Sequence, residues 1–490
     1  MALMTRRNAL ILGGIGVAGM AIGGTVFAAT RPGVGSGSGD PGGGQDFLEP
    51  AELRSTNGRL AATLTPARQQ VTLAGRDVSA LSYNGGVPGP TLRVRAGDTL
   101  SVSLRNGLTD PSNLHVHGLH VSPENNGDNM FVSVAAGDTF DYEYVLPANH
   151  PPGVYWYHPH AHGSVADQVF GGLYGAIIVE DPVPIAASRE RVLVISDITF
   201  TGVGDIAAAT AHEIMSGREG ELVLVNGQLN PTLAARPGER ERWRIVNACV
   251  SRYLRLRLDG QRMSLLAIDS GRFESAQEME EIVLAPGNRA DLLVTVSAGT
   301  AVLRSLAFDR GASGGMMGGG SGTPVDVDLA TLTVAGKAGE ALEQIPTQPV
   351  PRDLRATTVS ARRELVFAMG MGGGMGGGMM SATINGRVFD ASRIDTTVQF
   401  DSVEEWLLTN TSTLDHPLHL HVWPMQIVEE GGQPVRTVKW QDVVNVPANG
   451  SVRVRVAFED FSGRSVYHCH ILDHEDSGMM GVIDAYPPWV

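Results

Sequence analysis

The sequence predicts an all-β protein of three consecutive β-sandwich domains. Three segments begin alike, because an Asn-Gly pair at Asn84, Asn226 and Asn385 precedes strand-like residues, and another asparagine follows 21 to 25 residues later. The Asn-Gly pairs are 142 and 159 residues apart, a normal domain size. Between them Leu92 and Val94 show the period-two alternation of half-buried strands, and 61 glycines and 27 prolines suit a turn-rich fold.

The N-terminus reads as an export signal. Arg6 and Arg7 precede a Gly/Ala-rich apolar run that ends near Ala29, so residues 1–29 predict twin-arginine export to a periplasmic or other extracytoplasmic location. We expect no stable membrane association once this signal is cleaved; the alternative is an uncleaved anchor. Residues 30–46 have the composition of a flexible Gly/Ser-rich linker.

Domain limits follow from the repeat and from two Pro-rich connections. We expect the first domain over residues 47–183, the second over 184–340 and the third over 341–490. The net charge of −15 provides no basic patch for phosphates and argues against nucleic acid as a partner. Two cysteines cannot form a disulfide framework, and Cys249 is predicted to be a small buried apolar residue.

The stretch from Tyr467 to Met480 contains several potential metal ligands close together in the sequence. Cys469, His474 and Met479 supply a thiolate, an imidazole and a thioether, which with one further histidine form the donor set of a blue-copper site. His468 and His470 flank the cysteine, so in an extended strand they point away from it, toward a second metal site. A structural zinc site is less well supported, because it would need four N/S ligands and often a second nearby cysteine.

Four His-X-His pairs occur in the first and third domains and not in the second. On a strand both rings of such a pair lie on one face, at a spacing that suits two neighbouring metals. Together they offer eight imidazoles, enough for three coppers between two domains; they are His115/His117, His158/His160, His419/His421 and His468/His470. No role beyond surface or packing is needed for His120, His150, His162 and His212.

With these motifs complete, the chain resembles the three-domain multicopper oxidases, the family of laccases and bacterial cuprous oxidases. The resemblance covers the chain after the linker. It implies cupredoxin-like Greek-key domains and four coppers per chain. It implies a type 1 copper on His416, Cys469, His474 and Met479, a type 2 copper on His115 and His419, and a type 3 pair on His117, His158, His160, His421, His468 and His470. Met480 is assigned to packing.

The resemblance also implies a mechanism. Electrons from a reducing substrate would enter through the exposed edge of His416 or His474, pass through Cys469, and reduce dioxygen to water at the trinuclear cluster. Glu475 matches the position of a proton-relay glutamate; the alternative is a solvated surface carboxylate. Asp128 is our expected acid near the cluster, although it could be an ordinary turn aspartate, since the family often places its acid nearer the motif, at Asn126 here.

A methionine–glycine run, residues 369–380, bears on the substrate. Thioethers favour Cu(I), and the possible Cu(I) ligands are Met369, Met371, Met375, Met379 and Met380; Met316 and Met317 form a second cluster. Seven glycines in the twelve residues argue against a helix and predict a mobile lid, and the alternative is a disordered insertion with incidental methionines.

We therefore expect a monomeric exported oxidase that converts Cu(I) to Cu(II) for copper tolerance, with dioxygen as the electron acceptor. The alternative is a laccase that oxidises phenols or other small organic reductants. A non-catalytic scaffold or copper store on the same fold is a third hypothesis, which the complete ligand set disfavours.

Overall fold

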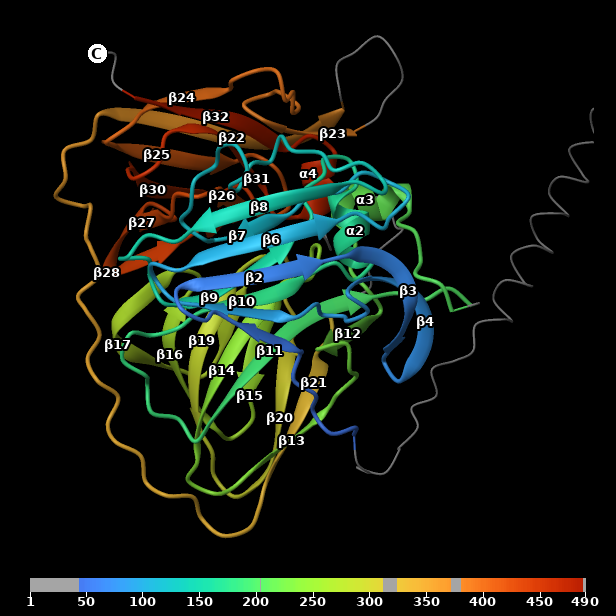
Figure 1. Ribbon diagram of the computed structural model, residues 1–490. Helices are drawn as coiled ribbons and strands as arrows, with labels where there is room; N and C mark the ends of the chain where they lie inside the picture. Colours follow the sequence, from blue (N-terminus) through green and yellow to red (C-terminus); the bar gives the residue numbers. More distant parts are fainter. Residues whose placement is uncertain (1–43, 203, 312–323, 372–379, 488–490) are drawn as a thin grey trace, which may run out of the picture. The chain divides into compact units, whose positions relative to one another are not determined.

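The computed structural model describes residues 44–202, 204–311, 324–371 and 380–487, and it confirms the all-β prediction. Strands form three successive sandwiches, coloured blue to cyan, green to yellow and orange to red in Figure 1. The described part of the chain contains three short helices and no helix long and apolar enough to cross a membrane. The predicted export signal, residues 1–29, lies outside the described residues.

The first sandwich is the smallest, and it carries two of the histidine pairs. Its main sheet has the order β1-β5-β10-β9-β7, opposed by β2-β6-β8, and the β3-β4 hairpin extends from one end. The elements are β1 (Glu52–Arg54), β2 (Arg59–Leu64), β3 (Pro66–Leu73), β4 (Arg76–Tyr83), β5 (Thr91–Val94), β6 (Thr99–Arg105), β7 (His115–His117), β8 (Thr139–Val145), β9 (Gly153–His158), α2 (Val165–Phe170) and β10 (Gly175–Val179).

The second sandwich pairs a sheet of order β12-β11-β14-β19-β16-β17 with one of order β13-β21-β20-β15-β18. Its elements are β11 (Arg189–Ile198), α3 (Ala211–Ser216), β12 (Leu222–Val225), β13 (Thr232–Ala235), β14 (Arg240–Asn247), β15 (Leu254–Leu258), β16 (Arg262–Ile268), β17 (Gly271–Met279), β18 (Ile282–Leu284), β19 (Arg289–Thr295), β20 (Gly299–Leu306) and β21 (Val327–Val334).

The third sandwich repeats this plan, with orders β23-β22-β25-β30-β27-β28 and β24-β32-β31-β26-β29. Its elements are β22 (Ala361–Met371), β23 (Met380–Ile384), β24 (Thr396–Gln399), β25 (Ser402–Asn410), β26 (His416–Leu420), β27 (Met425–Glu430), β28 (Gln433–Gln441), β29 (Val443–Val446), β30 (Ser451–Phe458), β31 (Gly463–Cys469), α4 (Leu472–Asp476) and β32 (Met480–Tyr486).

The repeated Asn-Gly pairs make the same turn in all three sandwiches. Asn84, Asn226 and Asn385 have φ of 55°, 51° and 53°, and each following glycine also has positive φ, as a two-residue type I′ hairpin requires. Each asparagine Oδ1 also accepts a backbone N–H from a neighbouring segment, at 2.7 to 2.8 Å. The sequence repeat therefore reflects one structural unit used three times.

The later asparagine of each repeat also has a common role. Asn106, Asn247 and Asn410 each donate from Nδ2 to two backbone carbonyls, one in the loop that follows the asparagine and one in a later segment, at 2.7 to 3.0 Å. Because these side chains are buried, the paired donors hold the loop that follows the strand in each sandwich. In the first and third sandwiches, that loop leads directly into a histidine strand.

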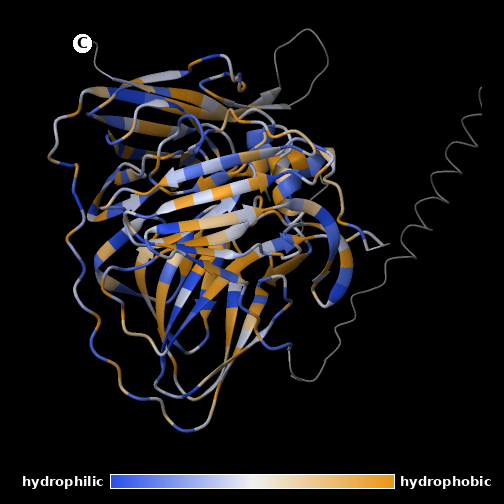
Figure 2. Cartoon of the chain, viewed as in Figure 1, coloured by the Kyte–Doolittle hydropathy of each residue, from blue (hydrophilic) through white to orange (hydrophobic). Residues whose placement is uncertain are grey.

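Alternating burial builds a separate core in each sandwich. In β30, for example, every second residue is buried, and Figure 2 shows hydrophobic and hydrophilic residues alternating along many of the strands. A further core cluster joins all three sandwiches, since it contains Trp156 of the first, Val192 of the second and Leu472 of the third. Helices α2 and α3 both pack against α4, and this junction lies next to the histidine strands.

The residues before the first sandwich are attached to the second one. Phe47 N–H donates to the Thr232 carbonyl at 3.0 Å, and Thr232 N–H donates to the Gln45 carbonyl at 2.8 Å. The last residues of the segment predicted to be a linker, from Gly44 on, are therefore paired with β13. The predicted domain limits stay predictions.

Candidate metal centre

Strand pairing brings the four His-X-His motifs together. β7 pairs with β9 so that His115 lies opposite His158, and β26 pairs with β31 so that His419 lies opposite His468. The two pairs of strands come from the first and third sandwiches, and their rings meet at the junction: His117 stacks on His419 with centroids 3.8 Å apart. All eight predicted histidines are buried.

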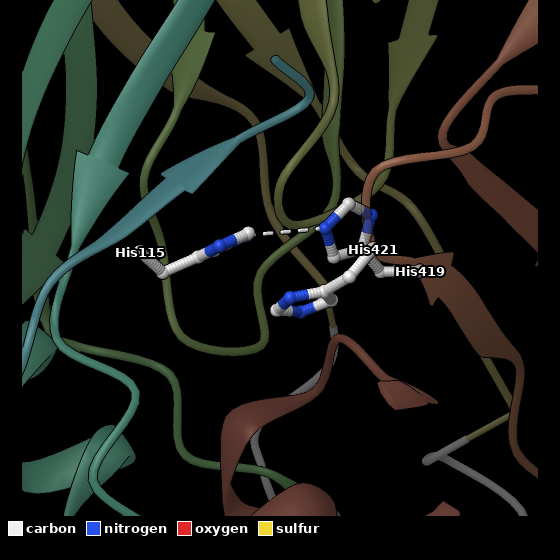
Figure 3. Close-up of side chains that lie close together, drawn as sticks. All are labelled: His115, His419 and His421. Atoms are coloured by element: carbon white, nitrogen blue, oxygen red, sulfur yellow. Dashed lines mark hydrogen bonds between the residues drawn. The ribbon is translucent and has the colours of Figure 1, made fainter. Parts of the chain in front are cut away.

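Three groups of imidazole nitrogens converge within this cluster. In the first, Nε2 of His115 lies 3.3 Å from Nε2 of His419. Figure 3 shows these two rings with His421, whose ring stacks on His115 at 3.9 Å between centroids. The outer nitrogens are held: Nδ1 of His115 bonds to the Asp128 carboxylate at 2.9 Å, and Nδ1 of His419 donates to the Asp442 carbonyl at 2.8 Å.

The second group joins His160, His421 and His468. Nε2 of His468 lies 3.1 Å from Nε2 of each of the other two. Nδ1 of His468 donates to the carbonyl of the neighbouring Cys469 at 3.0 Å, so Nε2 is the nitrogen whose lone pair can bind a metal. Nδ1 of His160 is 3.4 Å from Glu475, so the outer face of this group is acidic.

The third group contains His115, His117 and His158, and His470 lies beside it, with its ring centroid 4.9 Å from that of His117. Nδ1 of His117, Nε2 of His158 and both nitrogens of His470 are buried and have no hydrogen-bond partner. The other nitrogens of the first two are occupied, because Nδ1 of His158 donates to the Pro159 carbonyl at 2.8 Å and Nε2 of His117 bonds to Asp442 at 3.1 Å. Unpaired buried nitrogens are costly unless a ligand occupies them.

These groups fit metal ions. Burial lowers the pKa of all eight imidazoles, so they are neutral and can ligate. Two nitrogens bound to one metal at about 2.0–2.1 Å lie roughly 3.1–3.4 Å apart, and the first two groups have this spacing, at 3.1 to 3.3 Å. Lone pairs this close repel unless a cation lies between them, and imidazole is a preferred ligand of copper.

A separate donor group lies on the other face of β31. Sγ of Cys469 is 3.5 Å from Nδ1 of His416 and 3.9 Å from Nδ1 of His474. Met479 is also fully buried in the same core, and its carbonyl accepts the Cys469 N–H at 3.0 Å. Burial raises the pKa of the Cys469 thiol, so a bound cation is required to stabilise the thiolate. These residues fit a mononuclear copper.

The expectation of an exposed imidazole edge at this centre was wrong. His416 and His474 are both 0% exposed. Nε2 of His474 donates to the Met215 carbonyl of α3 at 3.0 Å, and Nε2 of His416 bonds to the Ser412 hydroxyl at 2.8 Å. The second sandwich contributes α3, so the sequence motifs of the third domain could not reveal this cover.

Both predicted acids lie beside the histidine cluster. Asp128 also accepts the Val116 N–H at 3.1 Å, and burial raises the pKa of its carboxyl to about 8. Glu475 is fully buried with one oxygen 3.0 Å from Nδ1 of His468, and burial raises its pKa to about 7. Neither is a surface carboxylate. Asn126, the other position considered, is bonded to the Asp141 carbonyl outside the cluster.

The methionine run is described only at its ends. Met369 is half-buried in β22 and packs against the third core, two residues from Phe367, whose ring stacks on His416 with centroids 6.2 Å apart. Met371 and Met380 form the last strand pair, with their side chains outside the description. Met375 and Met379 lie outside the described residues, as do Met316 and Met317.

Cys249 is buried, unbridged and packed in the second core, and Met480 is buried.

Sequence reasoning missed the carboxylate that joins two of the histidines. Asp442 precedes β29 and bonds to His117 through its side chain and to His419 through its carbonyl. Arg289 of β19 binds this carboxylate with two hydrogen bonds, of 2.5 and 2.6 Å. Neither residue lies in a histidine motif, so no local signal marked them.

Comparison with known proteins agrees with this geometry. Family models described as multicopper oxidase match residues 66–184, 189–302 and 357–488. A multicopper oxidase of Staphylococcus haemolyticus is 28% identical over 89% of this chain and 91% of its own length, and the cell division protein FtsP of Proteus mirabilis is 27% identical over 82% and 85%.

A solved structure is similar over nearly the whole fold. The multicopper oxidase from Campylobacter jejuni, described as a metallo-oxidase, aligns with a TM-score of 0.80 and 30% identity, covering 91% of this chain and 96% of that one. This chain therefore belongs to the multicopper oxidases, oxidoreductases that bind four coppers and use dioxygen with a reducing substrate.

Proposed function

We propose that this protein oxidises Cu(I) to Cu(II) and reduces dioxygen to water, as a means of copper tolerance. The type 1 copper would be held by His416, Cys469, His474 and Met479, and the type 2 and type 3 coppers by the three nitrogen groups described above. When bound, these ions supply one-electron transfer at the first centre and four-electron reduction of dioxygen at the second.

The observation that carries the choice of substrate is the burial of both type 1 imidazoles. A phenol cannot lie against either ring edge, because Ser412 and the Met215 carbonyl occupy the outer nitrogens. An electron must instead cross this layer of protein from a donor bound outside it. A Cu(I) ion held outside this layer by thioethers suits such electron transfer better than a phenol ring, which would have to contact the imidazole edge. The similar Campylobacter jejuni protein is described as a metallo-oxidase.

The described ends of both methionine–glycine runs lie close to this centre. β22 leads from Phe367 toward Met371, and Phe367 stacks on His416. Gly311 precedes the second run and lies so close to the Thr413 carbonyl, three residues before His416, that a Cβ there would be 1.9 Å from the oxygen. Met369, at the described start of the first run, is therefore available as a soft donor for Cu(I) near the type 1 site.

The chain's own residues then conduct electrons and protons. His468, in β31, and His470, directly after its end, flank Cys469, so the two centres are connected through covalent bonds. Asp128 and Glu475 can each hold a proton near neutral pH beside the histidines of the cluster. Both are our candidates for proton donors in dioxygen reduction.

Oxygen uptake by the copper-loaded enzyme tests this proposal. Cu(I) as sole donor should be oxidised faster than a simple phenol in copper-free buffer. A variant with leucine at Met371, Met375, Met379 and Met380 keeps loop length and should lower Cu(I) turnover while leaving phenol turnover unchanged. Strong phenol turnover with weak Cu(I) turnover would make the enzyme a laccase. No uptake with any donor would favour the scaffold hypothesis instead.

We also propose export by the twin-arginine route, from the sequence of residues 1–29. We propose a monomer because two domains of one chain supply all eight cluster histidines.

A further inference from the structure

The second domain supplies none of the predicted copper ligands, yet one of its loops lies directly beneath the trinuclear cluster. The loop runs from Ala285 to Arg289, at the start of β19. A Cβ at Gly287 would lie 2.8 Å from the ring of His470, so the backbone of this loop packs on a cluster histidine. Its φ of +87° favours glycine as well.

Arg289 reaches from this loop to Asp442 of the third domain. Its guanidinium donates from Nη1 and Nη2 to the two carboxylate oxygens, and from Nε to the Val154 carbonyl of the first domain at 3.1 Å. Both side chains are buried, so this bidentate pair is fixed and shielded from water. Residues of all three domains therefore meet at one guanidinium.

Asp269, also in the second domain, contacts both Arg289 and the backbone of Asp442. One oxygen lies 3.2 Å from Nη1 of Arg289, and the other accepts the backbone N–H groups of Asp442 and Val443 at 3.2 and 3.1 Å. Asp442 is thus held at its side chain by Arg289 and at its backbone by Asp269. We call Arg289 and Asp269 the second-domain clamp.

The clamp acts on two predicted copper ligands through Asp442. The carboxylate accepts Nε2–H of His117, which leaves Nδ1 as the ligating nitrogen, whereas the Asp442 carbonyl accepts Nδ1–H of His419 and leaves Nε2. The two rings stack at 3.8 Å and so present opposite nitrogens toward different metal positions. Without a fixed Asp442, neither ring would be held in its tautomer.

We propose that Arg289 and Asp269 are positioning residues of the trinuclear cluster, through which the copper-free second domain sets the type 2 site. The packing leaves little room for adjustment: a Cβ at Gly118, which follows His117, would lie 2.2 Å from Nη2 of Arg289 and 2.8 Å from Asp442. The proposal concerns copper retention and holds whichever donor the enzyme oxidises.

The test compares Arg289→Met with a matched control, Arg242→Met. Arg242 is also buried in the second domain and forms a bidentate pair, with Asp291 at 2.9 and 2.6 Å, but it contacts no histidine in the described structure. Copper per chain, the type 2 electron paramagnetic resonance signal and chelator competition are measured on the loaded proteins. The blue absorption of the type 1 copper serves as an internal control.

We expect Arg289→Met to weaken retention of the type 2 copper by about 10- to 100-fold while the blue absorption stays, and Arg242→Met to change neither. Equal type 2 retention in the two variants would overturn the proposal. If Arg289→Met does not fold, Arg289→Lys and Asp269→Asn decide: each should alter the type 2 resonance spectrum, and unaltered spectra in both would overturn the proposal.

Discussion

The protonation of Glu475 provides the sharpest prediction. Its carboxyl is fully buried, 3.0 Å from Nδ1 of His468, and burial raises its pKa from 4.5 to about 7. At about 1.36 kcal/mol per pH unit, ionising it inside the protein costs about 3 kcal/mol more than in water. About half of the molecules should therefore carry this proton at pH 7, against about 1 in 300 for an ordinary glutamate.

The sign of the pH dependence follows from this shift. Between pH 4.5 and about 7 the folded protein binds more protons at Glu475 than the unfolded chain does, so this residue lowers stability as the pH rises. Replacing it by glutamine should leave the copper-free protein unchanged near pH 4 and stabilise it by up to about 3 kcal/mol at pH 8. An isosteric control, Glu143→Gln on the exposed face of β8, should show no such pH-dependent gain.

Infrared difference spectroscopy measures the proton directly. The spectrum of the copper-free protein minus that of Glu475→Gln isolates the C=O stretch of the protonated carboxyl. Titration should abolish this band with a midpoint near pH 7. A band already lost at pH 5.5 would show that the carboxyl is solvated or paired, and the reasoning from burial would be refuted.

Three further variants test other parts of the site. Cys469→Ser removes the type 1 thiolate through which electrons reach the cluster, so it should abolish the blue absorption and oxygen uptake with every donor, as visible spectra and an oxygen electrode would show. Asp128→Asn should slow dioxygen reduction by about 10²- to 10⁴-fold while leaving reduction of the type 1 copper unchanged in stopped-flow measurements; equal slowing of both steps would contradict a role at the cluster. Replacing residues 205–216, which include α3, with a short glycine linker uncovers Nε2 of His474 and should raise phenol turnover relative to Cu(I) turnover; an unchanged ratio would remove the main support for Cu(I).

The fold was predictable because its signals are local. A type I′ turn needs positive φ at two successive residues, and Asn-Gly supplies that at Asn84, Asn226 and Asn385. The histidine groups were predictable for a related reason. Extended backbone at the end of β31 turns His468 to the side away from Cys469, and the His-Cys-His motif marks this pattern whatever the rest of the chain does.

The remainder of the site depends on contacts between domains. Arg289 and Asp442 are separated by 153 residues, and the Met215 carbonyl reaches His474 from 259 residues away. Neither contact has a periodicity or a motif, because each depends on how one sandwich packs against another. The motif residues of the third domain contain no information about α3. For this reason the sequence predicted an exposed imidazole at the type 1 site, where the structure has a covered one.

The junction of distant strands also constrains the order in which the protein matures. His115 and His419 meet at 3.3 Å although 304 residues separate them, and His160 meets His468 across 308. A growing chain that has completed only its first two domains therefore holds one of the three histidines in each nitrogen group that spans the junction. Copper bound there acts as a cross-link between the early and late parts of the chain, and it adds a stabilising constraint only after the last strands have folded.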